Sequence, residues 1–218
     1  PRGGVPISTA AQSLAAALLA IVALAAGPAR AEPAAAAGEA DAFAAGALQL
    51  GLMGGHAWGF GGPFASEGTE NEELRLALVA PSLGIGISEL WGRNHWYRGS
   101  FALFGEGQLW WNREPRGGFG GGIGTLLRYQ LLAVRERGIV PFVESGIGLA
   151  GIDFDLRSQR DGFNFLLQAG AGAHWLWRPN TALSAGYRYH HISNAGSRRP
   201  NAGINSHLAH LGITYFLR

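Results

Sequence analysis

A histidine and a serine stand two positions apart near the end of the chain, at His191 and Ser193. They close a segment of alternating polar and apolar residues that predicts a β-strand, and residues i and i+2 of a strand project from the same face. We therefore expect the two side chains to be neighbours. An imidazole beside a hydroxyl can act as the base that activates a serine nucleophile. The pair indicates a serine esterase.

The residues that follow this pair, 194–205, are rich in Gly, Asn and Pro. Glycine permits unusual backbone conformations and close approach of a ligand, and asparagine side chains offer amide donors. Donors aimed at a developing oxyanion stabilise the transition state of acyl transfer. We therefore predict that Asn194, Gly196 and Asn201 bind the oxyanion or the substrate. The alternative is ordinary turn formation, for which the same residue types are typical.

The chain from about residue 47 onward alternates in the manner of β-strands separated by turns. In 163–177, for example, Phe, Leu, Ala and Trp occupy one face, and Asn164, Gln168 and His174 the other. Aromatic residues fringe several segments, as at 110–111, 175–177 and 215–216, and such girdles are typical of membrane interfaces. The predicted strands are 47–55, 74–86, 97–111, 119–132, 140–152, 163–177, 182–193 and 206–217.

The number of these segments, about eight, matches the strand number of the smallest bacterial outer-membrane barrels. The predicted fold class is all-β, an eight-stranded antiparallel transmembrane β-barrel. The alternative is a soluble lipocalin-like barrel with its polar face outside. In the membrane barrel the polar face lines the lumen, where we expect a packing network of paired charges rather than an active site. Its predicted members are Glu106, Arg128, Glu144, Arg188 and His190.

Parity places the His191 and Ser193 pair on the same face as Leu183, Tyr187 and Tyr189, which is the face predicted to contact lipid. Both ends of an even-stranded barrel lie in the periplasm, so the connection after Ser193 is expected outside the cell, as is a first loop over 56–71. The pair is then level with the outer leaflet. The alternative explanation is an interface wet enough to tolerate any polar side chain.

Composition limits the remaining possibilities. The 218 residues include 0 Cys, and the net charge of +2 shows no basic stripe, so we expect no disulfide framework and no nucleic-acid partner. The seven histidines show no spacing with acidic residues that predicts a metal site. The predicted organisation is a signal peptide over 1–31, a low-complexity lead-in over 32–46 and the barrel over 47–218.

The sequence resembles the PagL-type lipid A 3-O-deacylases. The resemblance is carried by His-Ile-Ser-Asn-Ala-Gly at 191–196, Pro-Asn-Ala-Gly-Ile at 200–204, and the segments 141–148 and 164–172. It implies a bacterial outer-membrane barrel that hydrolyses an ester of lipopolysaccharide at the outer leaflet without a cofactor. His191 would be the base and Ser193 the nucleophile, with a groove on the barrel wall holding the acyl chain. Lipid A is the implied partner, and a homodimer is one arrangement to consider.

The sequence departs from that family at one position. The family carries a glutamate just after the second motif, where this chain has Asn205. An amide oxygen can still accept the imidazole N–H and fix its tautomer, but it brings no negative charge, and a tautomer wrongly set costs about 10⁴ in kcat in serine proteases. We predict Asn205 as the third catalytic residue. The alternative is a non-catalytic structural or adhesive barrel with a degenerate site. Arg198 and Arg199, in the same loop, would bind a lipid A phosphate or lie in solvent.

Overall fold

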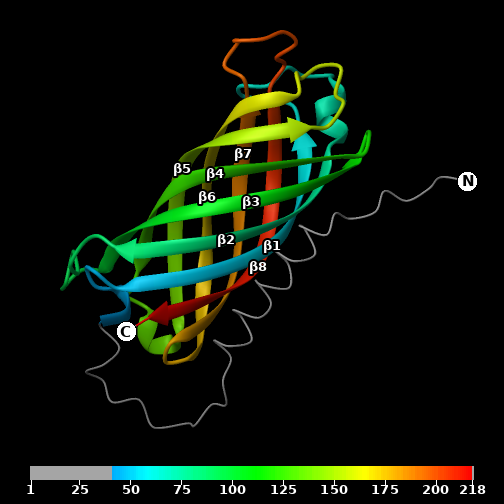
Figure 1. Cartoon of the computed structure of the whole chain (residues 1–218). Helices are drawn as coiled ribbons and strands as arrows, with labels where there is room; N and C mark the ends of the chain where they lie inside the picture. The colour runs from blue at the N-terminus through cyan, green and yellow to red at the C-terminus, as the bar shows by residue number, and fades with distance from the viewer. Residues whose placement is uncertain (1–40, 218) are drawn as a thin grey trace, which may run out of the picture. The chain divides into compact units, whose positions relative to one another are not determined.

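The computed structural model describes residues 41–217, so the predicted signal peptide and most of the lead-in lie outside the described residues. The described chain forms a closed antiparallel barrel in which consecutive strands pair and β1 closes the ring against β8, as predicted (Figure 1). The strands are β1 (Leu48–Phe60), β2 (Arg75–Gly86), β3 (Gly99–Glu114), β4 (Gly118–Leu131), β5 (Ile139–Asp153), β6 (Gly162–Arg178), β7 (Thr181–Ser193) and β8 (Ile204–Leu217). Short 3₁₀ turns are η1 (Asp41–Phe43), η2 (Glu70–Glu73) and η3 (Arg135–Arg137). Within 41–217, no helix has the length and apolar character needed to cross a bilayer.

The predicted strands are confirmed in number and order, but the first is longer than expected. Residues 56–60, predicted to open the first loop, continue β1 and pair with 205–209 of β8. The Gly and His content of this stretch resembles a loop. Its alternation is nevertheless kept, because Ala57 and Gly59 are buried while His56 and Trp58 are exposed. The first connection is therefore 61–74.

The two faces of the sheet separate as the alternation predicts. In β6 the residues at odd positions from Phe163 to Trp177 face outward, while Asn164, Gln168 and His174 are buried. Two aromatic residues predicted for the membrane girdle point inward instead. Trp110 is buried and donates from Nε1 to Gln108, and Phe216 packs against Phe43 with ring centroids 4.8 Å apart. The girdle prediction was wrong for these two, because adjacent aromatic residues of a strand point to opposite faces and Trp110 and Phe216 face the lumen.

The lumen is filled in three layers. An apolar cluster that includes Leu76, Trp110 and Phe154 fills the end near the first connection. A smaller cluster around Phe43, Val140 and Phe216 closes the opposite end. Between them lies a charged and polar layer, so the described barrel encloses a packed core rather than a channel.

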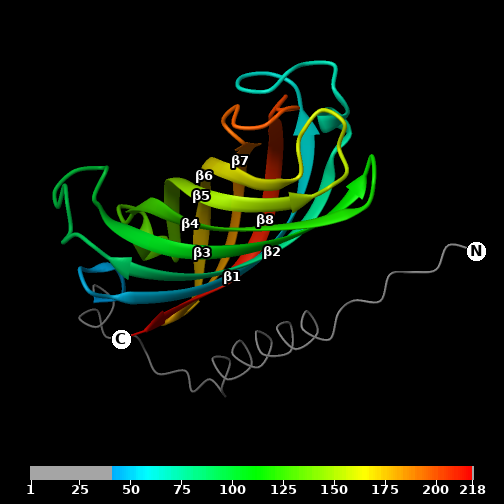
Figure 2. The same cartoon turned by 45° about the horizontal axis from the view of Figure 1, so that its top comes forward.

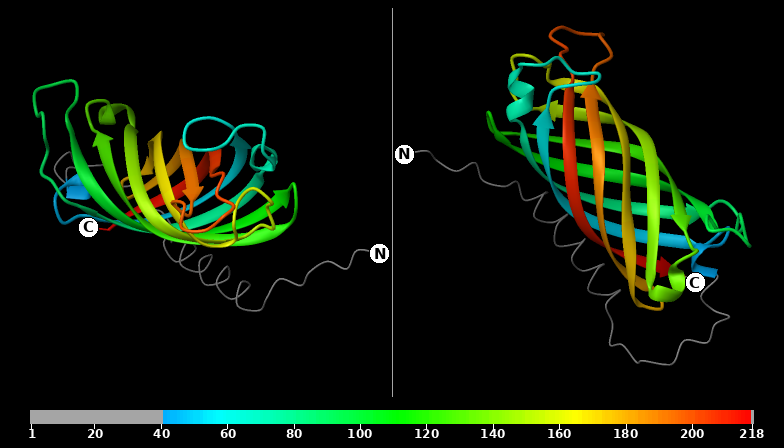
Figure 3. Two further views of the ribbon diagram at one scale, coloured as in Figure 1. Left: turned by 90° about the horizontal axis from the view of Figure 1, so that it is seen from above. Right: turned by 180° about the vertical axis from the view of Figure 1, so that it is seen from behind.

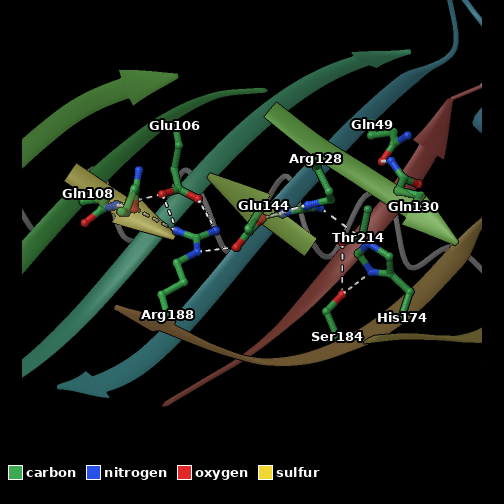
Figure 4. Close-up of polar contacts among 11 residues, drawn as sticks. Gln49, Glu106, Gln108, Arg128, Gln130, Glu144, His174, Ser184, Arg188 and Thr214 are labelled. Carbon is green, nitrogen blue, oxygen red and sulfur yellow. Dashed lines mark hydrogen bonds and ion pairs between the residues drawn. The ribbon is translucent and has the colours of Figure 1, made fainter. Parts of the chain in front are cut away.

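The polar layer is the predicted ion-pair network (Figure 4). Arg188 binds both oxygens of Glu106 at 2.7 and 3.0 Å, and its Nε donates to Glu144 at 2.5 Å. Arg128 donates to the other oxygen of Glu144 at 2.8–2.9 Å. His190 is buried in the lumen as predicted, but its Nε2 has no hydrogen-bond partner among the described residues. The network therefore contains four of the five predicted residues.

Connections 61–74, 154–161 and 194–203 gather at one end of the barrel, at the top in Figures 1 and 2. Figure 3 shows the same grouping from above and from behind. The first and last of these connections are joined by the Ser66 N–H, which donates to the Ala202 carbonyl at 2.7 Å. This end of the barrel carries the His191 and Ser193 pair, because β7 ends there.

Candidate active site

His191 faces outward from β7, as parity predicts. Its partners across the sheet are Leu167 on β6, which is 46% exposed on the outer wall, and Asn205 on β8. The imidazole itself is only 5% exposed. The Phe64 ring covers it edge to face, with centroids 5.8 Å apart. The expectation that this side chain contacts lipid directly was therefore wrong, because the first connection folds over it.

His191 and Asn205 form the contact that the third-residue prediction requires. Nδ1 of His191 lies 2.8 Å from Oδ1 of Asn205, and both residues are buried. An amide oxygen can only accept, so Nδ1 must carry the proton of this hydrogen bond. The lone pair of the neutral imidazole is then on Nε2, the nitrogen that can act as a base. The two residues are 14 positions apart, and the β7–β8 register brings them together.

Ser193 lies on the same outer face, two residues beyond His191. Its cross-strand partner is Phe165, which is 40% exposed on the outer wall, and Ser193 is half-buried. Within residues 41–217 its hydroxyl makes no hydrogen bond, including none to His191. Catalytic hydrogen bonds often tighten only when substrate is bound. The structure thus joins His191 to Asn205 and leaves the Ser193 hydroxyl beside them without a partner.

The predicted oxyanion residues lie in different surroundings. Asn194 is buried, and its backbone N–H donates to Oδ1 of Asn201 at 2.9 Å. That oxygen also accepts from Nε2 of Gln159 at 3.1 Å, so the Asn201 side chain holds the loop together. The Nδ2 of Asn194 is buried without a hydrogen-bond partner among the described residues. Both amides therefore keep an NH₂ group that bonds to no acceptor among the described residues, buried in Asn194 and partly exposed in Asn201.

The backbone next to Ser193 offers two further donors. Ala195 and Gly196 both take positive φ values, 53° and 77°. In the part of the chain that the structure describes, neither backbone N–H donates to an acceptor. Backbone N–H groups that bond to no other acceptor are among the donors from which oxyanion sites are built. Sequence reasoning missed Ala195, since a left-handed alanine has no signature of its own.

Gln159 ties the loops of this end together and was also missed. Its side chain is fully buried, accepts from the Gly203 N–H at 2.9 Å and donates to Asn164 at 2.9 Å. The backbones of 158–160 and 200–202 are bonded to one another as well, through Arg160 N to Pro200 O and Ala202 N to Ser158 O, both 2.9 Å. The connection 194–203 is therefore held in place by the connection 154–161.

The surroundings of Gly203 explain why the segment 200–204 contains a glycine. Its φ is +76°, and a Cβ there would lie 2.5 Å from the Phe64 carbonyl oxygen and 3.1 Å from Cε1 of His191. Only glycine allows this backbone conformation together with so close an approach. The Gly203 carbonyl also accepts from Nδ2 of Asn71 at 2.6 Å. The glycine brings the first connection and the imidazole into contact.

An apolar groove of about 700 Å³ runs across the outer wall and ends at Ser193 and Ala195. It crosses from β7 over β6, β5 and β4 to Gly105 on β3, with Ile147 and Phe165 among its walls. A second hollow of about 440 Å³ adjoins it and shares Thr125, Ile147 and Leu167. The wall near Ser193 is thus shaped to hold an extended apolar chain.

Arg198 and Arg199 are exposed in the 194–203 connection. Residues 41–217 contain no cluster of three or more His, Asp or Glu side chains arranged to hold a metal ion.

Similar sequences and similar barrel structures are found among known proteins. The family model described as lipid A 3-O-deacylase (PagL) matches residues 82–214. Lipid A deacylase PagL of Pseudomonas aeruginosa is 30% identical over 128 residues, covering 56% of this chain and 72% of that protein. The crystal structure of the outer membrane enzyme PagL aligns with a TM-score of 0.50 and 21% identity, over 75% of this chain and 97% of that one. Neisserial surface protein A (NspA) aligns with a TM-score of 0.50 and 15% identity, over 77% of this chain and 96% of that one. The two structural likenesses show a shared barrel fold.

Proposed function

Because the chain belongs to the lipid A 3-O-deacylase (PagL) family, we propose that it is an outer-membrane serine esterase acting on lipid A. The reaction is hydrolysis of the ester that links an acyl chain to the 3-O position of the sugar. The observation that carries this proposal is the apolar groove on the outer wall, which ends at Ser193 beside the hydrogen-bonded His191 and Asn205 pair.

The groove fits an acyl chain that is already confined to a membrane leaflet. It lies on the outward face, among exposed side chains such as Ile123, Ile147 and Leu149. A lipid can enter such a groove laterally from the membrane, so that its acyl chain leaves the apolar bilayer for an equally apolar protein surface. Its ester then meets Ser193 at the end of β7, where the apolar wall gives way to the polar connection. The proposed active site lies at the outer leaflet, with residues 1–31 serving export.

The chemistry follows from the placement of three side chains. The Ser193 oxygen attacks the ester carbonyl while Nε2 of His191 takes its proton, and Asn205 holds the imidazole. The donors available for the oxyanion are the backbone N–H groups of Ala195 and Gly196 and the Nδ2 groups of Asn194 and Asn201. Collapse forms an acyl-Ser193 ester and expels the sugar oxygen, which receives the proton from His191. Water, deprotonated by His191, then releases the fatty acid and restores Ser193.

The test is the mass of lipid A from bacteria that express the chain. Wild type is expected to remove one hydroxyacyl chain, and Ser193→Ala to remove none, a loss of at least about 10³-fold in rate. Ser66→Ala is the matched control, since Ser66 is an exposed serine of the first connection. Deacylation that persists in Ser193→Ala, with the protein folded in the outer membrane, would refute the serine mechanism.

A non-catalytic structural barrel is the second candidate function. It is favoured by Asn205, which replaces the acid of the family and brings no charge to an imidazolium. Lipid A left intact by the folded wild-type protein, in cells whose lipid A carries the 3-O chain, would contradict the esterase and favour this second candidate.

A further inference from the structure

The Asn205 amide is held at both ends. Its Nδ2 lies 2.6 Å from the carbonyl oxygen of Pro63, and its Oδ1 lies 2.8 Å from Nδ1 of His191. A carbonyl oxygen can only accept a hydrogen bond, so the amide atom facing Pro63 must be the NH₂ group. The oxygen of the amide is thereby turned toward the imidazole.

Tyr189 adds a second constraint on the same amide. Its hydroxyl donates to Oδ1 of Asn205 at 2.7 Å and lies 3.2 Å from the Pro63 carbonyl. Tyr189 precedes His191 by two residues on β7, so it shares the outer face and the same β8 neighbourhood. If the amide turned over, its oxygen would face the Pro63 carbonyl and its NH₂ would face Nδ1 of His191. Both the repulsion between oxygens and the lost hydrogen bonds oppose that arrangement.

We propose that the Tyr189 hydroxyl and the Pro63 carbonyl are positioning groups that make Asn205 a fixed, neutral acceptor for His191. The locked amide holds the imidazole in the tautomer with the proton on Nδ1 and leaves Nε2 free to act as the base. Among the described residues, no carboxylate bonds to His191, so the amide takes over the orienting part of the acid's role and none of its charge.

The first connection is part of this device. Pro63 supplies the carbonyl, the adjacent Phe64 covers the imidazole, and Ser66 is bonded to Ala202 of the last connection. Phe64 takes a positive φ of 68°, which an aromatic residue adopts only where its surroundings hold it there. The connection therefore shields the imidazole and sets the amide at the same time.

The proposal gives a positioning role to a tyrosine, so its test needs a measurement that reports the tautomer directly. The protein, labelled with ¹⁵N-histidine and folded in detergent micelles, is studied by NMR, with the His191 signals assigned by their loss in His191→Gln. Wild type is expected to show His191 protonated on Nδ1. Tyr189→Phe is expected to populate the other tautomer and to lower kcat about five- to tenfold with KM unchanged.

Tyr187→Phe is the matched control. Tyr187 lies on the same face of the same strand, and its hydroxyl bonds to His207 rather than to Asn205. We expect this variant to keep both the His191 tautomer and kcat of wild type. Tyr189→Phe with a wild-type tautomer and kcat would overturn the proposal, as would a wild-type His191 protonated on Nε2.

This inference rests on the proposed function only for the meaning of a free Nε2, and the two fail separately. A folded wild type that releases no fatty acid but keeps the Nδ1 proton, and loses it in Tyr189→Phe, contradicts the esterase and supports the locked amide. An active wild type with an unaffected Tyr189→Phe does the reverse.

Discussion

Replacing Glu144 by glutamine should destabilise the barrel more than any change of a surface charge. The Glu144 carboxylate is fully buried and accepts hydrogen bonds from Arg188 at 2.5 Å and from Arg128 at 2.8–2.9 Å. With Glu106 it balances two arginines, so Glu144→Gln leaves one positive charge uncompensated in the lumen. Removing one partner of a buried ion pair costs about 3–5 kcal/mol of the free energy of unfolding.

The contacts that remain place the expected loss at the lower end of that range, about 3 kcal/mol. Arg188 keeps both bonds to Glu106. Arg128 keeps the faces of Phe104 and Phe142, at 4.1 and 4.5 Å from its guanidinium carbon. Cation–π contacts of this kind offset only part of a lost carboxylate.

The assay is urea unfolding in detergent micelles, followed by tryptophan fluorescence and by the shift in gel mobility between folded and unfolded barrel. The control is Asp155→Asn, because Asp155 is 82% exposed in its ion pair with Arg116 and surface pairs contribute less than about 1 kcal/mol. Adding Arg128→Met to Glu144→Gln restores charge balance and should recover part of the loss. A single variant as stable as wild type, or a double variant less stable than the single one, would refute the reasoning.

Two further predictions concern the site. Gly203→Ala should lower kcat/KM about 100-fold, because the added Cβ would displace Phe64 and the His191 imidazole. Its control is Gly196→Ala, which has a similar φ of +77° but no atom within 4 Å of the added Cβ and should affect kcat/KM far less. Equal effects of the two substitutions would contradict this explanation. Gly105→Leu, at the far end of the groove where a Cβ meets nothing within 4 Å, should shift the released fatty acids toward shorter chains by mass spectrometry. Gly54→Leu, an exposed glycine on β1, is its control, and an unchanged chain-length distribution in Gly105→Leu would exclude the groove as the acyl site.

Much of the architecture was predictable from local pattern. The alternation of β6 assigns Phe165 and Leu167 to the outer wall and Gln168 to the lumen, and the structure confirms each. The same parity places His191 and Ser193 together on the outer face. Alternation is a property of neighbouring residues in an extended chain, so it requires no knowledge of what the strand packs against.

The candidate site was predictable only in part. The outward orientation of His191 and its hydrogen-bond acceptor, Asn205, were expected from the sequence. The orientation of the Asn205 amide was not. That orientation depends on Pro63 and Tyr189, and Pro63 is 142 residues from Asn205 along the chain. Likewise, no local pattern indicates that Phe64 covers the imidazole or that Gln159 braces the loop.

The sequence by itself determined the period-two faces, the succession of strands, and the imidazole and hydroxyl that share one face. Tertiary structure alone decided which loop closes over that face, which way the amide points and where five strands leave a groove between their side chains. The physical reason is range. Side-chain parity follows from one strand's backbone, whereas register, loop packing and the hollows between strands arise only when distant segments meet.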